Sequence, residues 1–275
     1  MPQDAPDQPL KNRSAKAPRP EKAHPGDTLL RINKALAGAG VCSRRAADEL
    51  IKQGAVRVNN RTITEPGLKI NPARDRVEVH GQVLSIPVPG SETHVYLALN
   101  KPPQVVSTLH DPEGRKALPD LLSPTIRKKR VFPVGRLDYF SQGLLLLTTD
   151  GELSFRLTHP KWHLPKTYQV MIRGEVTPRK LQTMRRGMTL SEGEKLAPVK
   201  VSAAKDKAGT TRLEMTLIQG VNRQIRRMCR DLDLVVLQLT RTSQGPITLG
   251  NMAQGKTRPL TDKEILELRR AVGLA

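Results

Sequence analysis

Apolar positions in the middle of the chain form a short continuous run at residues 144–147, directly after a loop bounded by Gly135 and Gly143. Such a run is typical of a strand buried on both faces, and the two glycines allow tight turns at both ends of the loop. The loop contains Asp138. A loop held by a buried strand suits a catalytic group, but an ordinary turn aspartate is the alternative on this pattern alone.

The pattern upstream predicts a small module of two helices and short strands over residues 27–86. A helical stripe ends at Gly38 and Gly40, and Ser43 is suited to cap a second helix over residues 44–53. The stripe consists of Leu29, Leu30, Ile32, Ala35 and Leu36. Strands are expected at residues 55–58, 61–64, 77–79 and 83–85. Residues 87–93 contain proline, glycine and serine, which is typical of a linker.

Residues 94–275 are expected to form a second, larger domain. Helices are predicted at residues 152–157, from Thr177 to Gly187, and after a capping box formed by Thr261 and Glu264. Segments rich in β-forming residues lie at residues 95–99, 166–172, 199–203, 212–218 and 234–240. This order predicts a largely antiparallel sheet with segregated helices, so the fold class of the chain is expected to be α+β.

The charge balance indicates a polyanionic partner. The 275 residues include 46 Lys and Arg against 26 Asp and Glu, a net charge of +20 at pH 7. Nucleic acid is favoured over a membrane, because no apolar run approaches the ~20 residues that span a bilayer. The first residues have no apolar signal-peptide core, so a cytoplasmic location is expected. Residues 1–26, rich in proline and charged side chains, are expected to be a disordered basic tail.

Neither metal nor cofactor chemistry is predicted. The two cysteines, Cys42 and Cys229, are far apart in helical patterns and are expected to be reduced thiols. His159 and His163 are four residues apart, but prolines interrupt that segment and no third ligand follows nearby, so no metal site is expected. The chain also contains no glycine-rich phosphate loop, dinucleotide fingerprint or nucleophile elbow.

The aromatic residues are few and are concentrated in one region. The chain has three Phe, three Tyr and one Trp. Six of these seven lie around the Asp138 loop in the sequence, namely Phe132, Tyr139, Phe140, Phe155, Trp162 and Tyr168. An unstacked nucleotide base needs an aromatic face. We therefore expect some of these rings to surround the loop, and Phe132 and Phe155 to fill the core.

An arginine-rich segment follows at residues 222–230. If it is helical, Arg223, Arg226, Arg227 and Arg230 share one face, and Ile225, Met228, Cys229 and Leu232 share the opposite face. Four guanidinium groups on one face repel each other unless they are solvated or matched by phosphates or carboxylates. Simple solvation is the alternative interpretation, especially for Arg230.

The smaller module resembles a known family. The strings GVCSRRAAD at residues 40–48 and GAVRVN at residues 54–59 are similar to the S4 RNA-binding domain. The resemblance implies that Ser43, Arg44 and Arg45 contact RNA. Solvated charges on a helix are the alternative for either arginine.

Three further motifs resemble those of the RsuA/RluB/RluE/RluF family of pseudouridine synthases. They are GRLD at residues 135–138, KTY at residues 166–168 and RQIRRM at residues 223–228. In this order behind an S4-like domain they cover roughly residues 28–270. The resemblance implies that Asp138 is the catalytic residue, assisted by Tyr168 and Arg226. Ser141 stands where many members have threonine, and both residues carry a hydroxyl group.

The activity implied is isomerisation of uridine to pseudouridine in ribosomal RNA, without a cofactor. In such a reaction Asp138 would attack as a nucleophile or abstract a sugar proton, Tyr168 would stack on the base or remove the C5 proton, and Arg136 would fill the gap left by the flipped nucleotide. Arg223 and Arg227 are expected to bind RNA. Residues 141–143 and 220–224 favour 23S RNA, with 16S RNA as the alternative. A monomer acting on ribosomal RNA or an assembling ribosomal subunit is expected, and a non-catalytic assembly factor is the alternative of another class.

Overall fold

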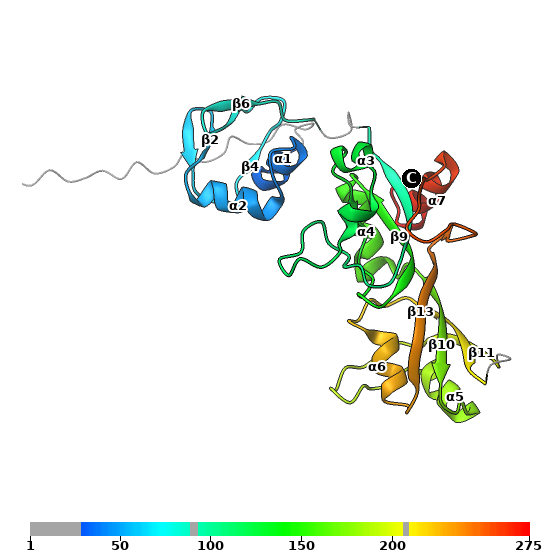
Figure 1. The fold of residues 1–275 in the computed structure, drawn as a ribbon. Helices are drawn as coiled ribbons and strands as arrows, with labels where there is room; N and C mark the ends of the chain where they lie inside the picture. The colour runs from blue at the N-terminus through cyan, green and yellow to red at the C-terminus, as the bar shows by residue number, and fades with distance from the viewer. Residues whose placement is uncertain (1–28, 89–92, 206–208) are drawn as a thin grey trace, which may run out of the picture. The chain divides into compact units, whose positions relative to one another are not determined.

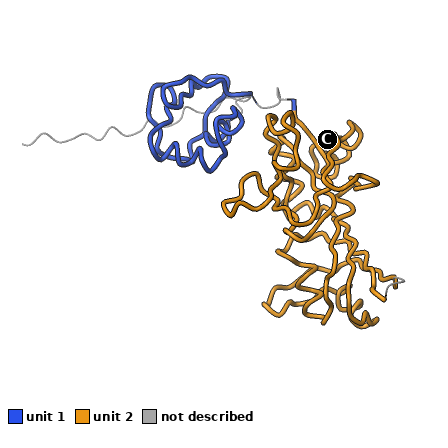
Figure 2. The backbone as a smooth tube through the Cα atoms, viewed as in Figure 1, with its two compact units in different colours: residues 1–93 blue, residues 94–275 orange. Residues whose placement is uncertain are grey.

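The computed structural model describes residues 29–88, 93–205 and 209–275. The chain divides into two compact units, residues 1–93 and 94–275 (Figure 2). The predicted tail at residues 1–26 and part of the predicted linker lie outside the described residues. Among the described helices, none combines the length and the apolar character needed to cross a membrane.

The smaller unit packs two helices and short strands around one apolar core. Its helices are α1 (Ile32–Gly38) and α2 (Arg44–Lys52). An antiparallel sheet has the order β3 (Arg61–Ile63), β2 (Val56–Val58), β5 (Val77–Val79) and β6 (Gln82–Leu84), and a separate pair joins β1 (Leu30–Arg31) to β4 (Lys69–Ile70). Both helices and the sheet contribute to the core through residues such as Leu36, Ile51 and Val77. The two helices and the small sheet are the elements that the sequence predicted for this module.

The start of the first helix differs from the prediction. Leu30 was expected in the helical stripe, but it pairs with Ile70 in a strand, and the helix begins at Ile32. The apolar spacing cannot distinguish the two conformations over so few residues, and the pairing with a distant segment decides. The second helix begins as predicted, because the Ser43 Oγ accepts a hydrogen bond from the backbone N–H of Ala46 at 3.2 Å.

The larger unit is built on one long sheet of order β11-β12-β10-β13-β9-β7-β15 (Figure 1). Its strands are β7 (Tyr96–Lys101), β9 (Gln142–Thr148), β10 (Lys166–Arg173), β11 (Lys200–Lys205), β12 (Thr211–Leu217), β13 (Val235–Gln244) and β15 (Thr257–Pro259), with β8 (Phe132–Pro133) beside β9 and β14 (Ile247–Thr248) beside β13. Within the described part of this sheet, β9 and β13 form the one parallel pair. The largely antiparallel sheet was predicted, as was the α+β class.

The helices lie at several places along this sheet. They are η1 (Leu118–Leu121), α3 (Pro124–Lys128), α4 (Gly151–Thr158), η2 (Pro160–Trp162), α5 (Pro178–Arg186), α6 (Gln224–Arg230) and α7 (Asp262–Ala271). The predicted capping box is present at the start of α7, where Thr261 and Glu264 bond each other's backbone N–H groups. Helix α3, with Ser123 as its cap, was not predicted.

Strand β9 is buried on both faces, as its continuous apolar run predicted. Leu144 and Leu146 pack with Leu153 and other residues of one apolar cluster. Leu145 and Leu147 belong to a second cluster that includes Leu99 and Leu118. Successive side chains of a strand point to opposite faces, so this one strand holds the two clusters together and fixes the position of the loop before it.

The parallel pairing of β9 and β13 is short and close. Thr240 pairs with Gln142, and Arg241 pairs with Gly143. Gly143 has a φ of 101°, and a Cβ atom there would lie 2.8 Å from the backbone nitrogen of Arg241 and still closer to its carbonyl oxygen. Only glycine fits this contact. The loop that carries Asp138 therefore ends where the β10–β13 half of the sheet meets the β7–β9 half.

Candidate active site

A cleft of about 290 Å³ lies at this junction. Five segments line it: the loop around Asp138, Thr158 at the end of α4, the start of β10 with Tyr168, a segment between Leu217 and Ile225, and the end of β13. Among the described residues that line the cleft, Asp138 alone carries a carboxylate. The structure thus brings residues of all three motifs, which are far apart in the sequence, to one cleft.

Arg226 of α6 faces Asp138 across the edge of this cleft. Its Nε atom lies 3.8 Å from the Asp138 Oδ2 atom, and its Nη2 atom donates to the Phe140 carbonyl and to the Ser141 Oγ, both at 3.3 Å. Burial lowers the pKa of the Arg226 guanidinium, and attraction to Asp138 opposes that shift. The Nε atom is buried without a hydrogen-bond partner. The pair is therefore close enough for strong electrostatic coupling and too long for a hydrogen bond.

Backbone and side-chain bonds hold the loop in place. The Ser107 hydroxyl donates to the Leu137 carbonyl at 2.8 Å and accepts from the Leu137 N–H at 3.1 Å. The Gln104 N–H donates to the Tyr139 carbonyl at 2.6 Å. These contacts come from the segment after β7, and together they leave the loop little freedom. Such preorganisation is what a catalytic group requires.

A buried lysine forms a hydrogen bond with the backbone of the same loop. Lys101 is fully buried, and its Nζ donates to the Ser141 carbonyl at 2.8 Å and to the Pro102 carbonyl at 2.9 Å. Burial lowers the pKa of Lys101 to about 8, against the raising effect of the Asp138 charge. The sequence analysis did not single out Lys101 or Ser107. The available signal was a lysine just beyond the apolar strand predicted at residues 95–99, which the structure makes the last residue of β7. Lysine is rarely fully buried unless it is paired.

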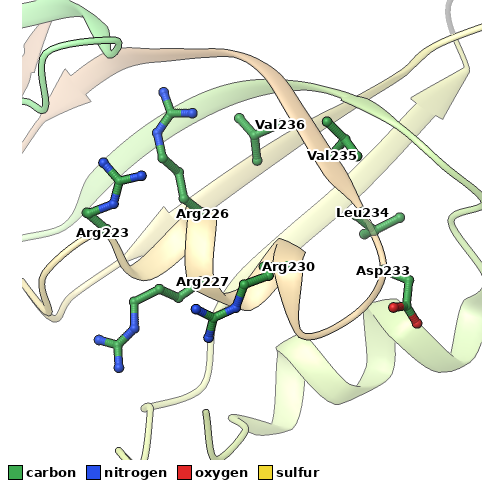
Figure 3. Close-up of a pocket in the computed structure, with 8 residues that line it drawn as sticks. All are labelled: Arg223, Arg226, Arg227, Arg230, Asp233, Leu234, Val235 and Val236. Atoms are coloured by element: carbon green, nitrogen blue, oxygen red, sulfur yellow. The ribbon is translucent and has the colours of Figure 1, made fainter. Parts of the chain in front are cut away.

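The arginine-rich segment divides into two groups. Arg223 caps α6 in a left-handed conformation with φ 49°, so the prediction of one helical face with four arginines is wrong. Figure 3 shows Arg223 and Arg226 extending to one side of the helix and Arg227 and Arg230 to the other, around a pocket of about 430 Å³. The opposite, apolar face is buried as predicted through Ile225, Met228 and Cys229.

Carboxylates of the protein itself engage the second group. Arg227 forms ion pairs with Glu192 and Glu194, and Arg230 pairs with Glu192 and with Asp231. Hydrogen bonds from the two arginines lower the pKa of Glu192 to about 2. These pairs offset the repulsion among the arginines without phosphate. The role of Arg227 as an RNA contact stays a prediction.

The aromatic rings are less concentrated than the sequence indicated. Tyr168 lines the cleft, and Tyr139 and Phe140 lie on the loop with their ring centroids 4.9 Å apart. Phe155 and Trp162 instead form a separate group with His159. The prediction that Phe155 fills the core is wrong, because it is 53% exposed. The inner face of α4 carries Leu153 and Leu157, and a residue midway between them points away.

Two other carboxylates that lie near Asp138 in the sequence, Asp111 and Asp150, form hydrogen bonds with other parts of the protein. Asp150 caps α4 through the N–H groups of Glu152 and Leu153, and it accepts hydrogen bonds from Tyr96 and Arg269. Asp111 forms a two-pronged pair with Arg115. Among the described residues, no group of three or more His, Cys, Asp and Glu is arranged to hold a metal ion.

The remaining predicted RNA contacts are exposed on the surface. Ser43, Arg44 and Arg45 are exposed at the start of α2. Arg136 is exposed at the mouth of the cleft, and Arg223 lines it. These positions are accessible to a large ligand, and their roles stay predictions.

Comparison with known proteins identifies the family. The model "RNA pseudouridylate synthase" matches residues 95–231, and "S4 domain" matches residues 30–77. The chain is 39% identical over 241 residues to the ribosomal large subunit pseudouridine synthase B of Bacillus subtilis, covering 87% of this chain and 95% of that protein. The chain belongs to the RNA pseudouridylate synthase family. The predicted resemblance to synthases of the RsuA, RluB and RluF type with an N-terminal S4 domain is thereby confirmed.

Other relatives agree with this assignment. This chain is 40% identical over 246 residues to an uncharacterized RNA pseudouridine synthase of Aquifex aeolicus, and the match covers 89% of this chain and 96% of that protein. It is 37% identical over 246 residues to the dual-specificity RNA pseudouridine synthase RluF of Escherichia coli, and the match covers 90% of this chain and 80% of that protein. The solved structure of a pseudouridylate synthase matches with a TM-score of 0.62 and 29% sequence identity, and the match covers 87% of this chain and 99% of that one. The enzyme class, an isomerase, is confirmed.

Proposed function

We propose that this pseudouridine synthase modifies ribosomal RNA, that its substrate is the RNA of the large subunit, and that Asp138 is its catalytic group. Support for the substrate comes from the similarity to the Bacillus subtilis large-subunit enzyme and from the net charge of +20, which favours a polyanion. The enzyme acts as a cytoplasmic monomer on ribosomal RNA or on an assembling subunit.

The reaction is an isomerisation that needs no oxidant. The bond between N1 of uracil and C1′ of the ribose breaks, the base turns, and C5 bonds to C1′. The C5 proton leaves and N1 gains a proton, so atoms and electrons balance. Asp138 drives this sequence either as a nucleophile toward the nucleotide or as a base toward a sugar proton. Tyr168, in the same cleft, stacks on the base or takes the C5 proton.

One observation carries the assignment of Asp138. Within the described residues it is the sole carboxylate lining the cleft. It lies on a loop fixed from several sides, and the buried Nε of Arg226 is 3.8 Å from its Oδ2. Asp150 and Asp111, the other candidates, are bound to helix N–H groups or arginines.

Replacing the carboxylate with an amide tests this role. Asp138→Asn is nearly isosteric and removes only the ionisable group. Single-turnover conversion of uridine should become undetectable, RNA affinity should stay within a few-fold, and the free energy of unfolding should change by about 0.5 kcal/mol or less. Asp111→Asn serves as a control that removes a carboxylate outside the cleft and should keep turnover. Appreciable turnover by Asp138→Asn would remove Asp138 from the chemistry.

Mapping pseudouridines in ribosomal RNA from a strain lacking the gene tests the substrate. We expect one or more pseudouridines to be missing from large-subunit RNA and to return on complementation. A loss confined to small-subunit RNA would favour the alternative substrate. Unchanged ribosomal RNA would refute the assignment to ribosomal RNA, and RNA binding without turnover by the wild type would leave an assembly factor.

A further inference from the structure

An irregularity in β13 places a residue in the cleft that no motif predicted. In the pairing of β10 with β13, Tyr168 lies opposite Arg241, and Lys166 lies opposite Gln244. Lys166 and Tyr168 are two positions apart on β10, whereas Arg241 and Gln244 are three positions apart on β13, so Thr242 is the extra residue at the register shift. Such a bulge changes which side chains share a face. Gln244 and Arg241 therefore lie on the face of Tyr168 and Lys166, and all four residues line the cleft.

The amide of Gln244 is buried without partners. Gln244 is 1% exposed, and neither its Oε1 nor its Nε2 has a hydrogen-bond partner. Buried polar groups are nearly always hydrogen-bonded, so two unmade bonds on one side chain indicate a group that awaits a ligand. Gln142, on the adjacent β9, shows the ordinary situation, since its Nε2 donates to Thr240 and its Oε1 accepts from Gln254.

The unmade bonds are concentrated at this cleft. Arg241 is 2% exposed, and its Nε donates to the Leu144 carbonyl at 2.7 Å, but its Nη2 has no partner. The buried Oε1 of Gln224, another lining residue, also lacks a partner. Arg241 and Lys166 can only donate hydrogen bonds, whereas the Gln244 amide offers both a donor and an acceptor.

We propose that Gln244 binds the polar edge of the target uracil, with its Oε1 accepting from N3–H and its Nε2 donating to a neighbouring carbonyl oxygen. This inference rests on the proposed function, in which a uridine enters this cleft. Uracil presents one N–H donor between two carbonyl acceptors, and a primary amide is complementary to a donor and an adjacent acceptor. Gln244 is then a specificity-determining residue for the base, distinct from the groups that act on the sugar and on C5.

The test removes the N3–H donor of the base and the Gln244 amide of the protein, separately and together. The substrate is an RNA fragment that carries the mapped target as uridine or as 3-methyluridine, which lacks the N3–H donor. Single-turnover rates are followed by product formation. We expect the wild type to convert 3-methyluridine about 10- to 100-fold more slowly than uridine, the loss typical of an unpaired buried group. Gln244→Met should be slowed by a similar factor on uridine and should show nearly equal rates for the two substrates.

Two further variants make the result specific. Gln238→Met is the same change at an exposed position of β13 and should keep the wild-type rate and the wild-type preference for uridine. Gln244→Glu retains an oxygen acceptor, so it should keep the preference for uridine over 3-methyluridine even if its rate falls. This variant also provides the test if Gln244→Met does not fold. A loss of preference in Gln244→Glu would contradict the proposal.

Other outcomes would also overturn it. The wild type could convert 3-methyluridine as fast as uridine, or Gln244→Met could keep the full preference. If Gln224→Met abolishes the preference instead, the acceptor is Gln224. A structural role would lower the melting temperature of Gln244→Met, whereas an amide unpaired in the free protein leaves it unchanged or raised. Failure of the proposed function is distinguishable, because the wild type would then not convert the uridine at all.

Discussion

At the scale of single residues, the Asp138–Arg226 pair is held slightly open. The guanidinium is oriented by bonds to the Phe140 carbonyl and the Ser141 hydroxyl, and not by a direct bond to the carboxylate. The Nε of Arg226 is buried without a hydrogen-bond partner and lies 3.8 Å from the Asp138 carboxylate. A small movement would let it donate a hydrogen bond to negative charge that develops at Asp138 or at the substrate during the reaction. This arrangement favours a role for Arg226 in turnover over one in phosphate binding.

Arg226→Lys separates these two roles. Lysine keeps the charge but loses the planar fork, so it cannot bond the loop and face Asp138 together. We expect single-turnover rates at saturating RNA to fall about 10- to 100-fold, as after loss of one oriented charged donor, while RNA affinity stays within a few-fold. Arg230→Lys, which alters an arginine paired with Glu192, is the matched control and should keep both quantities. A fall in affinity with unchanged turnover would make Arg226 a phosphate clamp.

At the scale of elements, the contact between β9 and β13 determines the shape of the cleft. The Asp138 loop runs into β9, while Arg241 and Gln244 lie on β13. The two strands approach closely only because position 143 has no side chain. The spacing between the Asp138 loop and Gln244 therefore depends on one glycine.

Gly143→Ala tests this dependence. A methyl group would collide with the Arg241 backbone at a φ of 101°, which L residues rarely adopt. We expect the larger unit to lose at least about 2 kcal/mol of unfolding free energy, from backbone strain and overpacking together. Chemical denaturation measures this loss. Gly151→Ala, at the first position of α4 with open space around it, should change stability far less. Equal stability of the two variants would show that the strands can separate at little cost.

At the scale of the whole molecule, the two units have different surfaces for RNA. The larger unit contains the cleft, and the S4 domain contains exposed basic residues at the start of α2. Ser43 makes the capping hydrogen bond of α2, and the side chains of Arg44 and Arg45 take no part in it. We therefore expect the S4 domain to add affinity through phosphate contacts and the larger unit to perform the chemistry.

Replacing Arg44 and Arg45 together with alanine tests this division. Each lost phosphate contact lowers the slope of log affinity against log salt concentration by about 0.7 to 0.9, so the double variant should lose roughly one to two units of slope. Turnover at saturating RNA should be unchanged. A charge-matched control, Arg173→Ala with Lys200→Ala, removes two exposed cations of the larger unit and should leave the slope near that of the wild type. An unchanged slope in the first variant would place both arginines outside the interface.

Features that depend on neighbours in the chain could be predicted from the sequence. The Ser43 cap, the capping box at Thr261 and the buried run in β9 are encoded within a few residues, so spacing and residue type were sufficient. The apolar face of α6 also followed from helical spacing. The three motifs indicated the family, because each motif is a short local string. The resemblance then implied that Asp138, Tyr168 and Arg226 share one site.

The tertiary structure alone decided what depends on a distant partner. Leu30 is in a strand because Ile70 pairs with it, and Arg227 turns from the cleft because Glu192 and Glu194 lie beside it. Lys101 reaches the Asp138 loop across 40 positions of the sequence. The position of Gln244 depends on a bulge against β10, which reverses the alternation that the sequence of β13 would predict. Local propensity acts over a few residues, whereas register and close contact are fixed only when separate strands meet.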